Sequence, residues 1–465
     1  MAQARPATAV VDIGKTNAKL VLVDERGEAF EIRTTPNRVV DAPPYPHHDV
    51  DALWRWLLQA LAALVREGHA IEAITITAHG AAGMFVRPDG GLAVPMIDYE
   101  FAGPGELEEY DRIRPPFSET ASPLLPGGLN VGRQVYYTQQ RFPREFAQAD
   151  SFLFNAQYWS ARFSGVRATE FTSLGAHTDL WEPARARLSS LVRAQGWERL
   201  FPPMRRADDV LGPITREVVE ATGLPAGCPV YCGIHDSNAS LLNYLRAGDP
   251  PPFSVVSSGT WVILMAPGCD TVLDPSRDML MNVDIDGRPV PSARFMGGRE
   301  FQLLTTTPAG GHPVSLRPAD IDAAVAAGAM FLPGFVPGTG PYPEAQGRLH
   351  GAQPASLDDT ARTALATLYV ALMTDVCLGM LRSRGPIWVE GSLAHSPQFL
   401  RVLATLRGEP VRGSSDATGA TRGAWLLTRR QAPAPVVPAT ASPDVALAPA
   451  LHAYREAWRK IVAGA

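Results

Sequence analysis

The chain has 465 residues, of which 42 are Lys or Arg and 47 are Asp or Glu, so its formal net charge is −5. This length favours two domains, and 46% hydrophobic with 19% charged residues is typical of a globular protein. The slight negative charge argues against a nucleic-acid-binding protein, which needs a basic surface to displace counterions from phosphates. The three lysines are Lys15, Lys19 and Lys460, so two of them lie four residues apart.

We expect a cytoplasmic protein with no membrane and no nucleic-acid partner, either a monomer or a homodimer. The apolar stretch 323–338 contains glycine and proline and is shorter than the roughly 20 residues that span a bilayer. The first ten residues lack the apolar core of a signal peptide. The four cysteines are too few for a disulfide scaffold and form no C-x-x-C pair, so we expect reduced, buried thiols.

Strand-like and helix-like segments alternate along the chain, which predicts an α/β protein. Residues 9–12 and 18–24 are short apolar strands separated by a glycine turn, so we expect the chain to open with antiparallel strands. Residues 51–67 carry one apolar stripe and predict a helix. Residues 73–77 predict a buried strand that ends just before His79.

Proline and glycine dominate residues 246–252 and predict a domain boundary there, which gives domains 1–247 and 248–465. The second half repeats the opening pattern of two strands around a small polar turn, so we expect two related domains. The further predicted elements are strands at 229–233, 253–257, 261–265 and 386–390, helices at 238–245, 357–383, 396–406, 417–428 and 452–462, and an Ala- and Pro-rich tether at 431–449.

The first candidate site is the turn within the sequence DIGKTNAK, which begins at Asp12. A glycine turn between strands can aim backbone N–H groups at an anion, and Asp12 suits a Mg²⁺ ion that keeps most of its water. The sequence is no P-loop, because the required spacing and the following helix are both missing, and a plain β-hairpin explains it equally well. The residues that could contact phosphate are Gly14, Lys15, Thr16, Asn17 and Lys19.

A second small polar turn comprises Ser258, Gly259 and Thr260. Serine-glycine turns are common and this one is weak evidence alone, but with the first turn it could hold phosphates from both domains. Gly391 and Ser392 follow a predicted strand, and a glycine there lets a flat base approach the backbone closely. An ordinary loop is an equally good explanation of this second pair.

Two further positions suit substrate chemistry. Asp236 stands where a strand passes into a helix, so it is either an N-cap or a general base that accepts a hydroxyl proton. His79 and Gly80 stand at the carboxyl end of a strand, where α/β proteins bind ligands. A packed or capped histidine without a substrate role is the alternative.

Taken in order, the segments DIGKTNAK, AHG, HDS, SSGTW and EGSL resemble the FGGY family of carbohydrate kinases over nearly the whole chain. The resemblance implies two RNase H-like (actin-like ATPase) domains with a deep interdomain cleft, the first binding sugar and the second binding nucleotide. It implies ATP and Mg²⁺ as cofactors, with Asp12 and Asp236 at the metal. It also implies that Asp236 is the catalytic base that removes a proton from a sugar hydroxyl.

The same resemblance implies the remaining contacts. Those to the nucleotide are Gly14, Lys15, Thr16, Asn17, Lys19, Ser258, Gly259, Thr260, Gly298, Gly391 and Ser392. Those to the sugar are His79, Gly80, Asp98 and His235. The family's usual W-x-D-x-R motif is replaced by Met96-Ile-Asp-Tyr-Glu100, so its Trp and Arg are missing here.

Within the family, the SSGTW and HDS segments are most similar to L-rhamnulose and L-fuculose kinases. This similarity implies transfer of the γ-phosphate of ATP to a 6-deoxy-ketohexose. The alternatives are a pentulose kinase of the xylulose or ribulose type, a non-catalytic sugar or nucleotide sensor on the same fold, and an actin- or Hsp70-like assembly ATPase.

Overall fold

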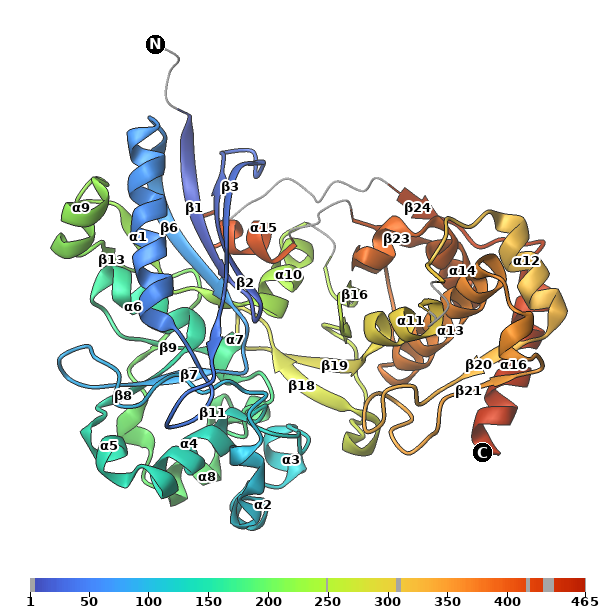
Figure 1. Ribbon diagram of the computed structural model, residues 1–465, viewed down its shortest axis with the longest axis horizontal. Coiled ribbons are helices and arrows are strands. Elements are labelled where there is room, and N and C mark those ends of the chain that lie inside the picture. Colours follow the sequence, from blue (N-terminus) through green and yellow to red (C-terminus); the bar gives the residue numbers. More distant parts are fainter. Residues whose placement is uncertain (1–4, 248–249, 307–310, 415–418, 430–438, 465) are drawn as a thin grey trace. The chain divides into compact units, whose positions relative to one another are not determined.

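The computed structural model describes residues 5–247, 250–306, 311–414, 419–429 and 439–464 (Figure 1). Its residues group into two compact units. Unit 1 comprises the described parts of 1–248, 281–289 and 418–434, and unit 2 those of 249–280, 290–417 and 435–465. Unit 1 is discontinuous in sequence, because the chain returns to it twice after its first passage to unit 2.

A seven-stranded mixed sheet forms the centre of unit 1, in the order β13-β14-β6-β1-β2-β3, with β15 also paired to β6. β1 pairs antiparallel with β2, which confirms the predicted opening, and parallel with β6. The strands of this sheet are β1 (Pro6–Ile13), β2 (Asn17–Val23), β3 (Ala29–Pro36), β6 (Ala70–Ala78), β13 (Val210–Pro213), β14 (Pro229–Tyr231) and β15 (Ile234–His235).

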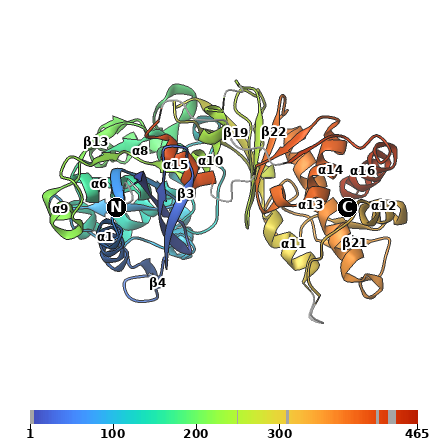
Figure 2. The same cartoon turned by 90° about the horizontal axis from the view of Figure 1, so that it is seen from above.

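The alternation of side chains along β1 decides which helices its residues meet. Val11 and Ile13 belong to a core cluster with residues of α1 (Val50–Arg66) and α6 (Asn155–Ser164). Val10 belongs to a cluster with residues of α10 (Asp236–Leu245) and α15 (Gly419–Leu426), two helices that pack side by side (Figure 2). Asp12 therefore shares the sheet face of α10 and α15.

The remaining elements of unit 1 are short. The helices are α2 (Glu108–Ile113), α3 (Phe117–Thr120), α4 (Val131–Arg141), α5 (Pro143–Gln148), α7 (Phe171–Leu174), α8 (Ser190–Ala194) and α9 (Arg216–Thr222). The strands are β4 (Val39–Val40), β5 (His47–His48), β7 (Gly83–Val86), β8 (Ser151–Phe154), β9 (Thr169–Glu170), β10 (Trp181–Glu182), β11 (Arg187–Leu188) and β12 (Met204–Arg205).

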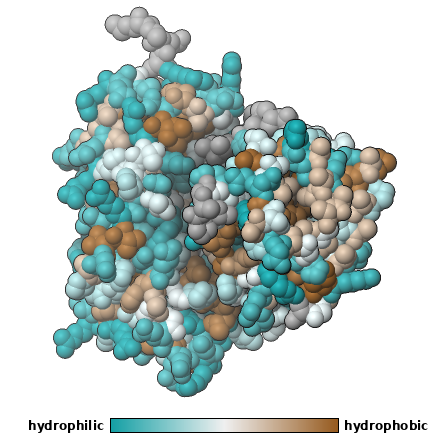
Figure 3. Space-filling model, turned by 45° about the vertical axis from the view of Figure 1, so that its right-hand side comes forward, coloured by the Kyte–Doolittle hydropathy of each residue, from teal (hydrophilic) through white to brown (hydrophobic). Residues whose placement is uncertain are grey.

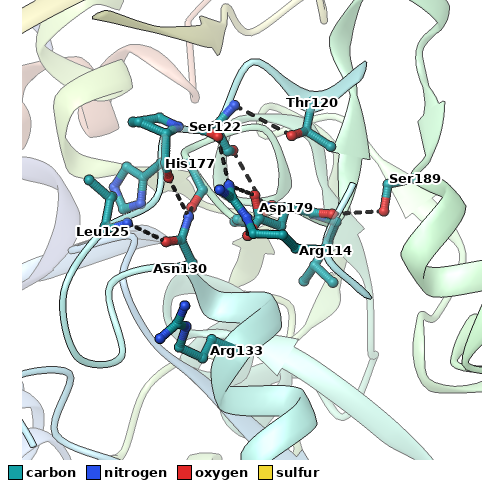
Figure 4. A network of polar contacts seen from close by, with 12 residues as sticks. Arg114, Thr120, Ser122, Leu125, Asn130, Arg133, His177, Asp179 and Ser189 are labelled. Carbon is teal, nitrogen blue, oxygen red and sulfur yellow. Dashed lines mark hydrogen bonds and ion pairs between the residues drawn. The ribbon is translucent and has the colours of Figure 1, made fainter. Parts of the chain in front are cut away.

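A polar network ties several of these short elements together (Figure 4). Arg114 donates two hydrogen bonds to the fully buried Asp179, at 2.7 and 3.1 Å. Asn130 accepts from the backbone N–H of Leu125 at 2.8 Å and donates to the carbonyl of His177 at 3.1 Å. Each buried polar group named here has a partner, which is what a rigid support requires.

Unit 2 is built on a second seven-stranded sheet, in the order β18-β19-β17-β16-β22-β23-β24. β16 pairs antiparallel with β17 and parallel with β22, as β1 pairs with β2 and β6, so both sheets share this local arrangement. The strands of this sheet and of the smaller β20–β21 pair are β16 (Ser254–Ser258), β17 (Val262–Met265), β18 (Met279–Val283), β19 (Pro289–Phe295), β20 (Met330–Leu332), β21 (Arg348–His350), β22 (Ile387–Gly391), β23 (Val411–Gly413) and β24 (Ala439–Ala441). The facing ends of β18 and β19, with the turn between them, are grouped with unit 1.

The helices of unit 2 cover this sheet and differ slightly from prediction. They are α11 (Gly297–Thr305), α12 (Pro318–Ala327), α13 (Asp359–Met380), α14 (Pro397–Arg407) and α16 (Ala448–Ala463). The predicted tether at 431–449 is wrong where it can be compared, because its described part forms β24 and the start of α16; residues 430–438 lie outside the described residues. The predicted helix 417–428 is observed as α15, and its residues 417 and 418 also lie outside them.

Among the helices of the described residues, α13 alone is long and apolar enough to cross a membrane by length and composition. Its apolar stretch is 89% buried, however, and it belongs to the main core cluster of unit 2. The face drawn in Figure 3 is mostly hydrophilic, with apolar residues in small separate patches. The four cysteines are free and buried, as predicted, and burial raises the pKa of Cys228 to about 11.

Candidate active site

The first predicted turn is short and held by backbone hydrogen bonds. The N–H of Gly14 donates to the carbonyl of Asn17 at 3.0 Å, and Asn37 donates to the carbonyl of Gly14 at 2.8 Å. A Cβ at Gly14 would lie 3.0 Å from that same Asn17 carbonyl, so the turn favours glycine. The side chains of Thr16 and Asn17 are exposed and available to a ligand.

Asp12 and Lys19 are directly opposite each other in the β1–β2 register. Burial is the main cause that raises the pKa of Asp12 to about 6; the Lys19 cation opposes this rise and the Asp236 carboxylate adds to it. Thr421 of α15 donates a hydrogen bond to Asp12 at 3.3 Å. Two carboxylates that repel each other, with a lysine nearby, suit a hydrated Mg²⁺, which binds few carboxylates. Within the described ranges, no group of three or more His, Cys, Asp or Glu converges on one point.

Asp236 is the first residue of α10 rather than a capping residue, and its side chain is 35% exposed. The N–H of Ser237 donates to its Oδ1 at 2.6 Å, and His235 Nε2 lies 3.1 Å from the same oxygen. The amide nitrogen of Asn238 donates to the Val283 carbonyl, so the Asn238 Oδ1 faces His235. That oxygen accepts from His235 Nδ1 at 2.8 Å and fixes the orientation of the imidazole. The carboxylate is thus oriented yet open to a ligand.

A buried layer supports this segment and was missed by sequence reasoning. Glu170 is fully buried and accepts from the N–H of Thr172, the hydroxyl of Thr172 and the N–H of Ser173 at 2.7–3.0 Å. The Thr172 hydroxyl in turn accepts from the N–H of His235 at 3.1 Å. Burial raises the pKa of Glu170 to about 7 despite these bonds. A local sequence pattern does not reveal this role, because the partners Glu170 and His235 lie far apart in the sequence.

Gly80 lies against the ring of His235, and His235 is close enough to His79 to affect its pKa. A Cβ at Gly80 would lie 2.5 Å from the His235 ring, so this close approach requires glycine. The His79 ring lies 6.0 Å from that of His48 and 5.6 Å from that of Tyr99, measured between centroids. Neither His48 nor Tyr99 was singled out from the sequence, because His48 precedes an ordinary amphipathic helix and Tyr99 stands in an altered motif.

Both of these buried histidines are neutral at physiological pH. Burial lowers the pKa of His48 to about 4 and that of His79 to about 3, and the positive charge of Lys15 lowers both further. Their ring nitrogens have no hydrogen-bond partner among the described residues. A neutral imidazole offers one donor and one acceptor, so these rings suit hydroxyl groups better than a charged ligand.

Lys15 points to the segment that replaces the W-x-D-x-R motif. Its ammonium forms an ion pair with Asp98, lies 3.6 Å from Glu100 and sits 4.7 Å from the centre of the Tyr99 ring. The charge of Asp98, a predicted sugar contact, is thereby balanced by Lys15, a predicted phosphate contact.

In unit 2, most of the predicted nucleotide contacts line one cavity of about 210 Å³. Ser258, Gly259, Gly298 and Ser392 contribute to its wall, beside apolar side chains that include Phe301 and Phe399. Small residues are required here, because a Cβ at Gly298 would lie 1.9 Å from the Gly259 carbonyl oxygen. The mixture of apolar wall and exposed backbone suits a flat heteroaromatic group.

Two predicted residues border this cavity without lining it. Gly391 adopts a positive φ of 75°, and a Cβ there would lie 1.9 Å from the Ser258 carbonyl oxygen. The Ser258 hydroxyl donates to the Glu390 carbonyl at 2.5 Å and accepts from the N–H of Leu393 at 2.9 Å, which joins the two turns. Thr260 is exposed at the tip of its turn.

Comparisons with known proteins identify related sequences and structures. Residues 250–435 match the family described as carbohydrate kinase FGGY, C-terminal domain. The chain is 29% identical over 270 residues to L-fuculokinase from Salmonella typhi, which covers 55% of each chain. It is 24% identical over 270 residues to rhamnulokinase from Bacteroides thetaiotaomicron, covering 55% of this chain and 53% of that protein. The chain thus spans about half the length of the curated relatives it matches.

Solved structures extend the likeness over the whole chain. A carbohydrate kinase from Novosphingobium aromaticivorans is 35% identical with a TM-score of 0.88, covering 100% of both chains. Xylulose kinase from Lactobacillus acidophilus, at 15% identity and a TM-score of 0.81 over 98% of this chain and 97% of that one, shares the fold. The predicted fold class, with two actin-like ATPase domains, is confirmed by these structures. Ordered motifs, paired sheets and full-length similarity lead to one assignment: the chain belongs to the FGGY family of carbohydrate kinases.

Proposed function

We propose that the protein transfers the γ-phosphate of ATP to a hydroxyl of an open-chain ketose, with Asp236 as the general base. The observation that carries this proposal is the state of Asp236, a carboxylate that is oriented by its neighbours yet 35% exposed. A buried structural carboxylate would not keep this opening, and a plain helix cap would not need the support of His235 and Thr172.

In the proposed reaction, Asp236 accepts the proton of the sugar hydroxyl as its oxygen attacks the γ-phosphorus. A new O–P bond forms, the bond from the γ-phosphorus to the bridging oxygen breaks, and ADP leaves. Phosphoryl transfer depends mainly on positioning and on stabilisation of charge. Lys19 and the turn at Gly14 supply positive charge and N–H donors for the phosphates.

Asp12, with Asp236 close enough to affect its pKa, offers the carboxylate oxygens that would hold Mg²⁺. The bound ion would neutralise charge on the transferring phosphates. The cavity lined by Ser258, Gly259, Gly298 and Ser392 would take the adenosine, since its wall combines apolar side chains with close backbone.

For the sugar, we propose a 6-deoxy-ketohexose such as L-fuculose or L-rhamnulose. The matches to an L-fuculokinase and a rhamnulokinase support this choice. A pentulose such as xylulose is the second candidate, favoured by the fold shared with a xylulose kinase. The absence of the W-x-D-x-R motif affects which sugar we expect to bind more than which reaction we expect.

The test is ADP release with Mg²⁺ and ATP against a panel of ketohexoses, 6-deoxy-ketohexoses and pentuloses. We expect one ketose class to stimulate turnover and Asp236→Asn to lower kcat by at least about 10²-fold. Asp359→Asn, an exposed residue at the start of α13, is the matched control and keeps full turnover. Tight sugar binding without any turnover would instead indicate a sensor, and strong ATPase activity without sugar an assembly ATPase.

A further inference from the structure

We propose that Lys15 serves the sugar rather than the phosphates of ATP, and that its pair with Asp98 selects an uncharged polyol over a sugar acid. This inference rests on the proposed function, because it assumes that the protein phosphorylates a sugar. The measurement of ATP binding in the Lys15 variant does not depend on that assumption. The inference assigns a specificity role to a residue in a turn whose other members suit phosphate.

The Lys15 side chain points toward the segment around Asp98. Lys15 and Asp98 are 83 residues apart, and their side chains are only 20% and 9% exposed. Among the described residues, the ammonium contacts Asp98, Glu100 and the Tyr99 ring, all within residues 98–100. Turning Lys15 toward a phosphate would leave the buried Asp98 carboxylate with the N–H of Glu100 but without a cation, which is costly.

Lys19 already meets the need for charge beside the phosphate turn. It stands opposite Asp12 in the strand register and its charge lowers the pKa of Asp12. The two lysines therefore act on different carboxylates, Lys19 on Asp12 and Lys15 on Asp98. A turn with one lysine at the metal and phosphates leaves the other for the sugar.

The surroundings of Lys15 suit hydroxyl groups. The ammonium of Lys15 lies over the Tyr99 ring, which is followed by His79 and then His48 at ring distances of 5.6 and 6.0 Å. The two imidazoles are neutral with unpartnered ring nitrogens in the part of the chain that the structure describes. A paired ammonium and carboxylate, together with neutral imidazoles, offer adjacent donors and acceptors. This set matches neighbouring hydroxyl groups, each of which donates once and accepts twice.

Charge then decides between polyols and sugar acids. Two carboxylates, Asp98 and Glu100, stand against the single ammonium of Lys15, so the local formal charge is negative while both histidines are neutral. The carboxylate of an aldonic acid would meet repulsion there and would have to displace Asp98 from Lys15. An uncharged ketose meets neither obstacle.

The experiment compares Lys15→Met, Lys19→Met and the matched control Lys460→Met, which changes the only other lysine, an exposed one in α16. Calorimetry measures the binding of ATP and of the active ketose separately, and steady-state assays give the KM for each. We expect Lys15→Met to weaken ketose binding about tenfold or more while ATP binding changes less than about twofold. Lys19→Met should do the reverse, and Lys460→Met should change neither.

Asp98→Asn is the second variant, and it tests the proposal even if Lys15→Met does not fold. Freeing the ammonium should shift the ratio of kcat/KM for the ketose to that for D-gluconate toward gluconate by about tenfold or more. Weakened ATP binding by Lys15→Met, or an unchanged ratio in Asp98→Asn, would overturn the proposal. If the unaltered protein phosphorylates no ketose, the proposed function fails. ATP binding by Lys15→Met still tests the role of Lys15 in that case: unchanged ATP binding supports a role away from the phosphates, and weakened ATP binding overturns it.

Discussion

Thr421 donates a hydrogen bond to Asp12 although 409 residues separate them in the chain. The bond exists because α15 returns to unit 1 and packs beside α10 on the face of the sheet that Asp12 shares. The residue expected to hold the metal is therefore supported by an element from near the other end of the chain.

Asp12 is expected to lower the free energy of unfolding near neutral pH, although turnover requires it. Its folded pKa of about 6 lies above the unfolded value of 3.8, so the folded state binds more protons between these pH values and stability falls as pH rises through them. We expect Asp12→Asn to raise the free energy of unfolding at pH 7.5 by about 1–3 kcal/mol and to abolish turnover. Urea unfolding at pH 7.5 and pH 4 measures this, and a variant that is less stable at pH 7.5 would contradict it.

His48 should have the opposite pH dependence. Its folded pKa of about 4 lies below the unfolded value of 6.5, so its contribution to stability is present above pH 6.5 and is lost as pH falls toward 4. The loss is at most about 3 kcal/mol. We expect His48→Gln to flatten the fall in melting temperature between pH 6.5 and 4. The exposed His350→Gln serves as the control and should leave the profile as it is; equal profiles for both variants would disprove the assignment.

The Thr172 hydroxyl should matter to turnover without touching the substrate. Thr172→Val removes the acceptor for the buried N–H of His235 and the donor to Glu170. We expect a loss of stability of about 1–3 kcal/mol and a fall in kcat of about tenfold or more as Asp236 is misplaced. Thr172→Ser keeps the hydroxyl and should restore both quantities. Full kcat in Thr172→Val would show that Asp236 does not depend on this layer.

Gly298 should be essential for the nucleotide cavity. Because the obstructing atom at 1.9 Å is a backbone oxygen, Gly298→Ala must displace the turn at Gly259. We expect ATP affinity to fall at least about tenfold, since small displacements in a preorganised site are costly. Gly379→Ala in α13 is the control, because nothing lies within 4 Å of its added methyl group, and it should leave ATP binding unchanged. Fluorescent-nucleotide titration compares the two.

Local patterns predicted the framework of the site well. The apolar runs around Gly14 and Gly259 gave the two antiparallel strand pairs, and the strand-to-helix step at Asp236 was found where expected. In each case, the residues that define the element lie within a few positions of one another, so periodicity and turn chemistry suffice.

The contacts within the site could not be predicted in the same way. Lys15 reaches Asp98, and His48 meets His79, across distances in sequence that no local pattern encodes. Thr421 belongs to a helix predicted correctly by type, but its position beside Asp12 depends on tertiary packing. Sequence therefore located the polar residues, while the fold decided which of them act together.

The placement of α15 in unit 1 also constrains how the chain is made. During synthesis, the face of the first sheet that carries Val10 and Asp12 emerges early, but the helix that completes its core emerges only after almost all of unit 2. Part of the apolar surface of the first sheet therefore stays exposed until α15 has been synthesised. A chaperone that binds exposed apolar segments would find its natural target there, and the release of that target would coincide with the last stage of translation.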